Sequence, residues 1–211
     1  MVRKQKAMRA TKQAAPAVIS EHDLQQLDQL SRILAPTGPD VSAALQFSMT
    51  MQRLRALMDQ DNIKQAIMGL RGFGYRTDKD WDRDRKQPGK GYAYDITRDC
   101  IIAGLTKGAA LINVEICIIN ARCYLGKAFF WRRLDEILGL GNWYFVHDDF
   151  RDCPGGTEVS SKIRWQPEDA QTWNEKAFVC HVKSDPYSSL DQIKGKADKR
   201  CGAWLLPIVA G

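Results

Sequence analysis

No run in the chain approaches the ~18 apolar residues that cross a bilayer, so we expect no membrane span. The first residues carry charge without an apolar stretch, which argues against a secretory signal. C-x-x-C pairs are also missing, and the six cysteines are scattered through 211 residues. That pattern is typical of reduced thiols that pack as small hydrophobes. These absences together predict a cytoplasmic protein.

Enzyme signatures are incomplete. No G-x-S-x-G occurs, so a Ser-His-Asp hydrolase has no starting point. The segment "ARCYLGKA" lies between a hydrophobic, strand-like run and a helix-like stretch, which is the setting of a P-loop. However, bulky residues separate Ala121 from Gly126, and Ala128 replaces the hydroxyl residue that ligates magnesium. We therefore expect no cofactor and no bond chemistry, and a divergent P-loop ATPase with the Walker-B-like run "WYFVHDD" remains an alternative.

Histidine is scarce, and the three histidines lie far apart in the sequence. The residues that strand pairing could assemble into a metal site are His147, Asp148, Asp149, Cys153, Cys180 and His181. No tight ligand pair enforces such a site, so we expect no bound metal. A metal-dependent nuclease built on Asp148, Asp149, Glu158 and Lys162 stays an alternative.

Acidic residues are missing from the first twenty positions, which hold Arg3, Lys4, Lys6, Arg9 and Lys12. These five cations leave only +1 of the net charge of +6 for the rest of the chain. A basic arm on a near-neutral body suggests a tail that meets an anionic partner, although a solubilising tail would look the same.

The hydrophobic pattern predicts an α+β protein. Its parts are a disordered basic arm (1–19), a helical region (20–75), a charged loop (76–91) and an α+β core (92–211). Apolar residues at steps of three and four predict the helices of the second part, the first of them capped by Ser20. Trp81 is an odd aromatic within the charged loop.

The core begins with a predicted helix and then changes to strands. "LINVEICII" predicts a hairpin that turns at Asn120-Ala121, followed by a helix from about Lys127 to Leu138. Three strands follow, and a long closing helix is capped by Ser188 or Ser189. We therefore expect an antiparallel hairpin and meander sheet packed on helices, with a helical N-terminal region and a long C-terminal helix.

Two groups of cations are the candidate binding residues. The first, at the hairpin end and on the next helix, contains Arg122, Lys127, Arg132 and Arg133, with Tyr124 among them. The second, on the closing helix, contains Lys194, Lys196, Lys199 and Arg200. Lys/Arg pairing with phosphates and base stacking on aromatics, here Tyr124, Trp131 or Trp204, is how single strands are held. Solvated helix surface is the competing interpretation for the cations, and core packing for Trp204.

The stretch "EICIINARCYLGKAFFWRRL" resembles the core motif of phage single-strand annealing recombinases of the RecT/Red-beta type. The residues on that pattern are Glu115, Ile118, Ile119, Arg122, Tyr124 and Lys127. Upstream, "DNIKQAIMGLRGFGYRTD" and "YDITRDCIIAGLTKG" are similar to the family's helical lead-in, and "SSLDQIKGKADKRCGAWLL" to its closing helix. The likeness covers residues 61–140 and 188–206, with Ile116 standing where an aromatic is usual.

The resemblance implies a hairpin sheet packed on a long helix, in subunits that assemble side by side as a homo-oligomer. It implies ATP-independent annealing of complementary single-stranded DNA in phage-type homologous recombination. The implied phosphate ligands are Arg122, Lys127, Lys196, Lys199 and Arg200, with Tyr124 stacking on a base. A 5′–3′ exonuclease and the host single-strand-binding protein are the implied partners. A phage structural or adaptor protein remains a third possibility.

Overall fold

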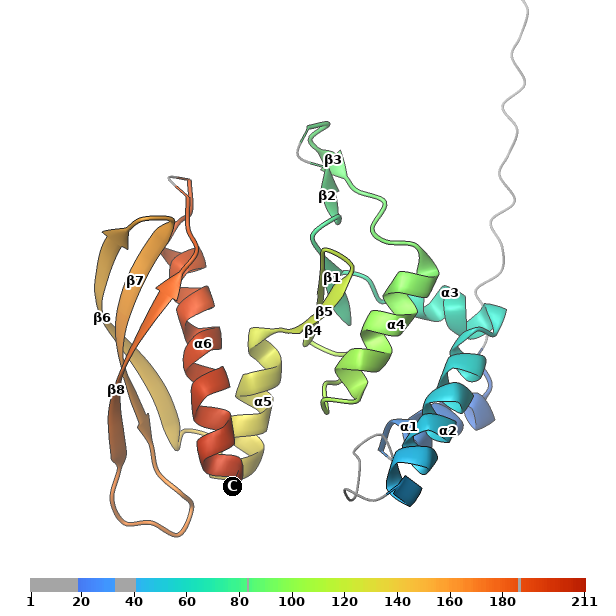
Figure 1. Cartoon of the computed structure of the whole chain (residues 1–211), viewed down its shortest axis with the longest axis horizontal. Coiled ribbons are helices and arrows are strands. Elements are labelled where there is room, and N and C mark those ends of the chain that lie inside the picture. The colour runs from blue at the N-terminus through green and yellow to red at the C-terminus, as the bar shows by residue number, and fades with distance from the viewer. Residues whose placement is uncertain (1–18, 33–40, 83, 186) are drawn as a thin grey trace, which may run out of the picture.

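The computed structural model describes residues 19–32, 41–82, 84–185 and 187–211 (Figure 1). The expected basic arm therefore lies outside the described residues, apart from Ile19. The chain is an α+β protein with antiparallel sheets and a long C-terminal helix, which confirms the predicted fold class. In the described part of the chain, no helix combines the length and the apolar character needed to cross a bilayer.

Four helices form the N-terminal part: α1 (Glu21–Arg32), α2 (Val41–Met58), α3 (Asp61–Gly69) and α4 (Tyr94–Leu105). Ser20 caps α1 as expected, because its Oγ accepts a hydrogen bond from the Asp23 N–H at 3.1 Å. The apolar stripes of these helices meet in a first core around the fully buried Leu54 and Ile101.

A three-stranded sheet lies against this core, in the order β1 (Tyr75–Thr77), β4 (Ile116–Ile119) and β5 (Arg122–Leu125). Strands β4 and β5 form the predicted hairpin, and β1 joins β4 in parallel. The turn is at Asn120-Ala121, as expected, where both residues have positive φ (50° and 57°). That is the backbone of a type I′ turn, whose twist matches the flanking strands.

The segment 76–91, expected as a charged loop, contains a second, smaller hairpin of β2 (Trp81–Asp82) and β3 (Gln87–Pro88). We call residues 78–82 and 84–91 the finger. Figure 1 shows β2 and β3 projecting beyond the tip of the β4–β5 hairpin. Two-residue strands rich in charge and Pro carry no apolar alternation, so the sequence pattern could not reveal them.

The C-terminal part consists of α5 (Lys127–Leu138), the antiparallel sheet β6 (Trp143–Cys153), β7 (Gly156–Trp165) and β8 (Asn174–Val182), and α6 (Leu190–Ala210). Helix α6 begins with a capping box of Ser189 and Gln192. Figure 1 shows α6 against one face of this sheet and α5 beside α6. Buried Leu134, Ile163 and Leu205 make a second core there.

Helix α5 is shared by the two cores. Phe129, in its first turn, is buried in the core of the N-terminal part, whereas Leu134 and Leu138 are buried against the C-terminal sheet and α6. Residues Lys127–Leu138 were predicted to be helical, and the stop at Gly139 is confirmed by its φ of 85°.

Candidate nucleic-acid interface

The β1–β4–β5 sheet has one face in the core and one open face. Arg76, Cys117 and Tyr124 are register partners on adjacent strands, so their side chains share a face. Ile119 and Arg122 form the next pair on that face. Their in-between neighbours, such as Ile116 and Ile118, are fully buried on the other side. We call the surface of Arg76, Cys117, Ile119, Arg122 and Tyr124 the open hairpin face.

Helix α6 reaches the open hairpin face. The Lys199 ammonium lies 5.9 Å from the centre of the Tyr124 ring, within the range of a cation–π contact. Burial raises the pKa of the Cys117 thiol, and the charges of Lys199 and Arg76 oppose that rise. Lys199 and Tyr124, which the sequence analysis assigned to two separate groups, therefore lie at one surface.

Two cations near the hairpin were missed in the sequence, Arg76 on the open hairpin face and Lys107 on the side of α4. Arg76 follows the buried Tyr75 in β1 and faces outward, an alternation that "GYRTD" could have indicated. Lys107 lies just after α4. Burial raises the pKa of the Cys123 thiol, and the charges of Lys107 and Lys199 oppose part of that rise. Lys107 and Arg122 also line a groove of about 460 Å³ between α4 and β5.

Lys127 lies at the start of α5, where two neighbours hold it. Its ammonium is 3.4 Å from Asp198 Oδ2 on α6 and 4.2 Å from the Trp131 ring centre. Burial alone would raise the pKa of Asp198, but the hydrogen bond and charge of His147 and the charge of Lys127 outweigh it and keep that pKa below its ordinary value. Lys127 remains 39% exposed, so its charge is partly neutralised but still accessible.

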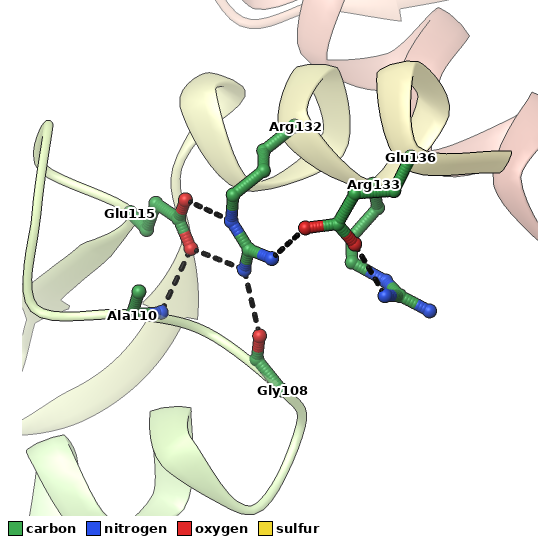
Figure 2. A network of polar contacts seen from close by, with 6 residues as sticks. All are labelled: Gly108, Ala110, Glu115, Arg132, Arg133 and Glu136. Atoms are coloured by element: carbon green, nitrogen blue, oxygen red, sulfur yellow. Dashed lines mark hydrogen bonds and ion pairs between the residues drawn. The ribbon is translucent and has the colours of Figure 1, made fainter. Parts of the chain in front are cut away.

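Arg132 is held in an internal network (Figure 2). Its Nε and Nη2 donate to the two oxygens of Glu115 at 2.6 and 2.8 Å, and Nη2 also donates to the Gly108 carbonyl at 2.8 Å. The Glu115 carboxylate is 1% exposed and also accepts from the Ala110 N–H at 2.8 Å. The guanidinium of Arg132 thus holds α5 against the loop before β4. Arg132 is therefore not part of the proposed interface.

Arg133 differs from its neighbour in exposure. It is 40% exposed and pairs with Glu136 at 2.5 Å, at the surface of α5. Glu136 also accepts from Arg132 Nη1 at 2.6 Å, so one carboxylate serves both arginines. Arg133 therefore forms a surface ion pair on α5, away from the open hairpin face as defined above.

The remaining cations of α6 divide between two directions. The Lys196 ammonium donates to the carbonyl of Lys183, after β8, at 2.7 Å. Burial raises the pKa of the Cys180 thiol of β8, and the charge of Arg200 opposes part of that rise. Lys194 is exposed on α6. Lys196 and Arg200 therefore follow the β8 side of the helix, while Lys199 turns to the hairpin.

The aromatic candidates also separate. Tyr124 stays 41% exposed on the open hairpin face. Trp204 packs against Trp165 and Phe178, with ring centres 6.3 and 5.6 Å apart, so the core interpretation of Trp204 is confirmed. Trp131 is 38% exposed and lies under Lys127, which makes it a support for that lysine.

The Gly-Lys segment has a different role from that of a phosphate cradle. Arg122–Leu125, which a P-loop would use to wrap a phosphate, are strand β5 and pair with β4. Gly126 then donates from its N–H to the Glu115 carbonyl at 2.6 Å. A methyl group on Gly126 would overlap the Val114 carbonyl oxygen, so glycine is needed for this close passage of two backbones.

The metal and nuclease candidates point to different faces of the β6–β7–β8 sheet. His147 is 8% exposed and lies beneath α6, bonded to Asp198. Asp148 pairs with Lys162 at 3.1 Å and Asp149 with Arg151 at 3.4 Å, where all four side chains are exposed. Among the described residues, no three His, Cys, Asp or Glu side chains are grouped so as to hold a metal ion.

A hydrogen-bonded Ser-His-Asp series, which the sequence did not reveal, runs beneath α6. Ser161 Oγ is 2.8 Å from His147 Nδ1, and His147 Nε2 is 2.9 Å from Asp198 Oδ1. Ser161 is only 3% exposed, so a substrate carbonyl cannot approach its hydroxyl. The series instead joins β7, β6 and α6, and through Asp198 it positions Lys127.

Comparison with family models, curated proteins and solved structures finds no match to this chain. The function must therefore be argued from the site itself. That site is an open sheet face with two arginines and a tyrosine, joined by a lysine of the last helix.

Proposed function

We propose that this protein binds single-stranded DNA and anneals complementary strands without ATP, as in phage-type homologous recombination. The observation that carries the proposal is the contact of Lys199 with Tyr124, because it brings the last helix and the hairpin to one surface. Two parts of the chain 75 residues apart in sequence thus meet at one exposed aromatic ring, with cations on both parts.

The chemistry of this surface suits a single strand. Arg76, Arg122 and Lys199 can neutralise successive phosphates, while Tyr124 offers a ring for a base to stack on. Lys127 extends the series toward α5, with its charge partly balanced by Asp198. Such contacts do not depend on sequence, which annealing requires.

Annealing needs no bond chemistry. Strands held by their phosphates on adjacent subunits, with base edges outward, can test their pairing using the free energy of duplex formation. We therefore propose a homo-oligomer, with a 5′–3′ exonuclease and the host single-strand-binding protein as partners. Cytoplasmic location belongs to the same proposal, and the six cysteines, all free, accord with it.

Salt dependence tests the proposed strand path. The log–log slope of affinity against salt is about −0.7 per neutralised phosphate on a single strand. Changing Arg122 and Lys199 together to Ala should therefore flatten the slope by about 1.4. Lys162→Ala, on the outer face of the other sheet, is the matched control and should leave the slope unchanged. A double variant with the slope of the wild type would remove the open hairpin face from the strand path.

Incubation with ATP, magnesium and labelled DNA separates the rival functions. Annealing without hydrolysis or cleavage is the expected result. ATP hydrolysis would favour the P-loop enzyme, and shortened DNA the nuclease. A protein that binds duplex and single strands equally weakly, without assembling on either, would instead fit the adaptor.

A further inference from the structure

The finger carries an aromatic side chain that neither core uses. Trp81 leaves 54% of its surface exposed, although tryptophan is among the side chains that gain most from burial. Its register partner across the hairpin is Pro88. An exposed tryptophan flanked by cations is a typical platform for a base of a single strand.

The finger is also concave. A cleft of about 570 Å³ is lined by Trp81 and by three cations, Lys79, Arg85 and Lys90, with the carboxylates of Asp78 and Asp82 also in its wall. This volume lies within the roughly 300–1,000 Å³ of typical small-ligand sites. Arg85 is engaged by Asp82, at 3.8 Å, which leaves Lys79 and Lys90 as the better placed phosphate ligands.

Hydrogen bonds fix the base of the finger to the tip of the β4–β5 hairpin. Asp78 Oδ2 accepts from the Asn120 N–H at 3.0 Å, and the Tyr92 hydroxyl accepts from the Ala121 N–H at 3.1 Å. The same hydroxyl donates to Asp78 Oδ1 at 2.8 Å. Lys79 lies over the Tyr92 ring, 4.2 Å from its centre. Since Arg122 follows this turn directly, the base of the finger lies next to one end of the open hairpin face.

The state of Asp78 supports a fixed connection. Burial would raise its pKa, but the hydrogen bonds from Asn120 and Tyr92 lower it below the ordinary value, so the carboxylate stays ionised and bonded to the turn. These bonds tie the base of the finger to the turn that precedes Arg122, so a site on the finger lies next to the open hairpin face.

We propose that the finger holds one nucleobase of the bound strand, stacked on Trp81, with the adjoining phosphates on Lys79 and Lys90. This inference rests on the proposed function, since it extends the same strand path beyond Arg122. It adds a site that contacts the base, whereas the cations of the open hairpin face contact the backbone.

Binding of two oligomers of equal length tests this site: oligo-dT, and the same sugar–phosphate chain without bases. Trp81→Leu should weaken binding of oligo-dT about fivefold or more and leave binding of the abasic chain and the salt slope unchanged. Trp173→Leu, which removes another exposed tryptophan from the loop before β8, is the control and should alter neither affinity. Lys79→Gln with Lys90→Gln should flatten the salt slope by about 1.4 and keep the preference for dT.

The outcomes distinguish the inference from its premise. If the wild type binds oligo-dT and Trp81→Leu binds it equally well, the finger site is refuted while the proposed function stands. An equal loss on both oligomers would also refute it, because Trp81 would then act on the fold or the backbone contacts. A wild type that binds neither oligomer overturns both proposals.

Discussion

Removal of the Arg132 guanidinium should be among the most damaging single changes at the surface of α5. Arg132→Met keeps the apolar stem of the side chain but leaves the Glu115 carboxylate, 1% exposed, with the Ala110 N–H as its remaining hydrogen-bond donor. A buried ion that loses its partner costs about 3–5 kcal/mol. Glu115→Gln should cost less, about 1–3 kcal/mol, because Arg132 stays partly exposed and keeps its bonds to Glu136 and Gly108.

The adjacent arginine provides the matched control. Arg133→Met removes a pair in which both side chains are about 40% exposed, which should cost about 0–1 kcal/mol. Glu115→Gln combined with Arg132→Met leaves no buried charge, so it should recover about 1 kcal/mol or more relative to Arg132→Met alone.

Urea unfolding followed by tryptophan fluorescence measures these differences. The expected order of loss is Arg132→Met, then Glu115→Gln, then Arg133→Met. Equal unfolding free energies for the two arginine variants would refute the reasoning, since burial of the partner carboxylate is the property that separates them. Under conditions where it stays folded, Arg132→Met should also keep the salt slope of DNA binding, because its charge is already neutralised.

Three further results are expected. Gly126→Ala should cost about 1–3 kcal/mol in thermal unfolding, because the added methyl would overlap a backbone oxygen, whereas Gly195→Ala, with open space around it, should be neutral or stabilising. Burial raises the pKa of Cys201 to about 12, so iodoacetamide at about pH 8 should modify this thiol only in unfolded protein, as mass spectrometry would show. Because the pKa of Asp198 lies below its ordinary 3.8, its carboxylate stabilises the fold above that pH and ceases to do so as the pH falls through the lowered value. The difference in Tm between wild type and Asp198→Asn should therefore be steady near neutral pH and shrink below about pH 4.

Local chemistry made much of the fold predictable from the sequence. The turn at Asn120-Ala121, the helix Lys127–Leu138 with its glycine stop, and the cap at Ser189 each depend on residues a few positions apart. Rules of hairpin turns and helix ends apply at that range, so these elements follow from short stretches alone.

The partners of the cations depend on contacts between distant segments. Arg132 and Arg133 are neighbours with the same helical surroundings, and what separates them is Glu115, 17 residues earlier. Lys199 is likewise set apart from Lys196 by the position of Tyr124. No periodicity within α5 or α6 contains this information, which is why the sequence could name candidate cations but not the partner of each one.

Helix α5 contributes Phe129 to one core and Leu134 and Leu138 to the other, which affects how the protein unfolds on heating. Neither half can lose its packing without exposing apolar surface on the one helix that both require. Calorimetry should therefore record a single endotherm, with equal van't Hoff and calorimetric enthalpies, where two loosely tethered halves would give two. A force applied to either part would then be transmitted to the other through α5. A force on the β4–β5 hairpin would therefore also act on the β6–β7–β8 sheet.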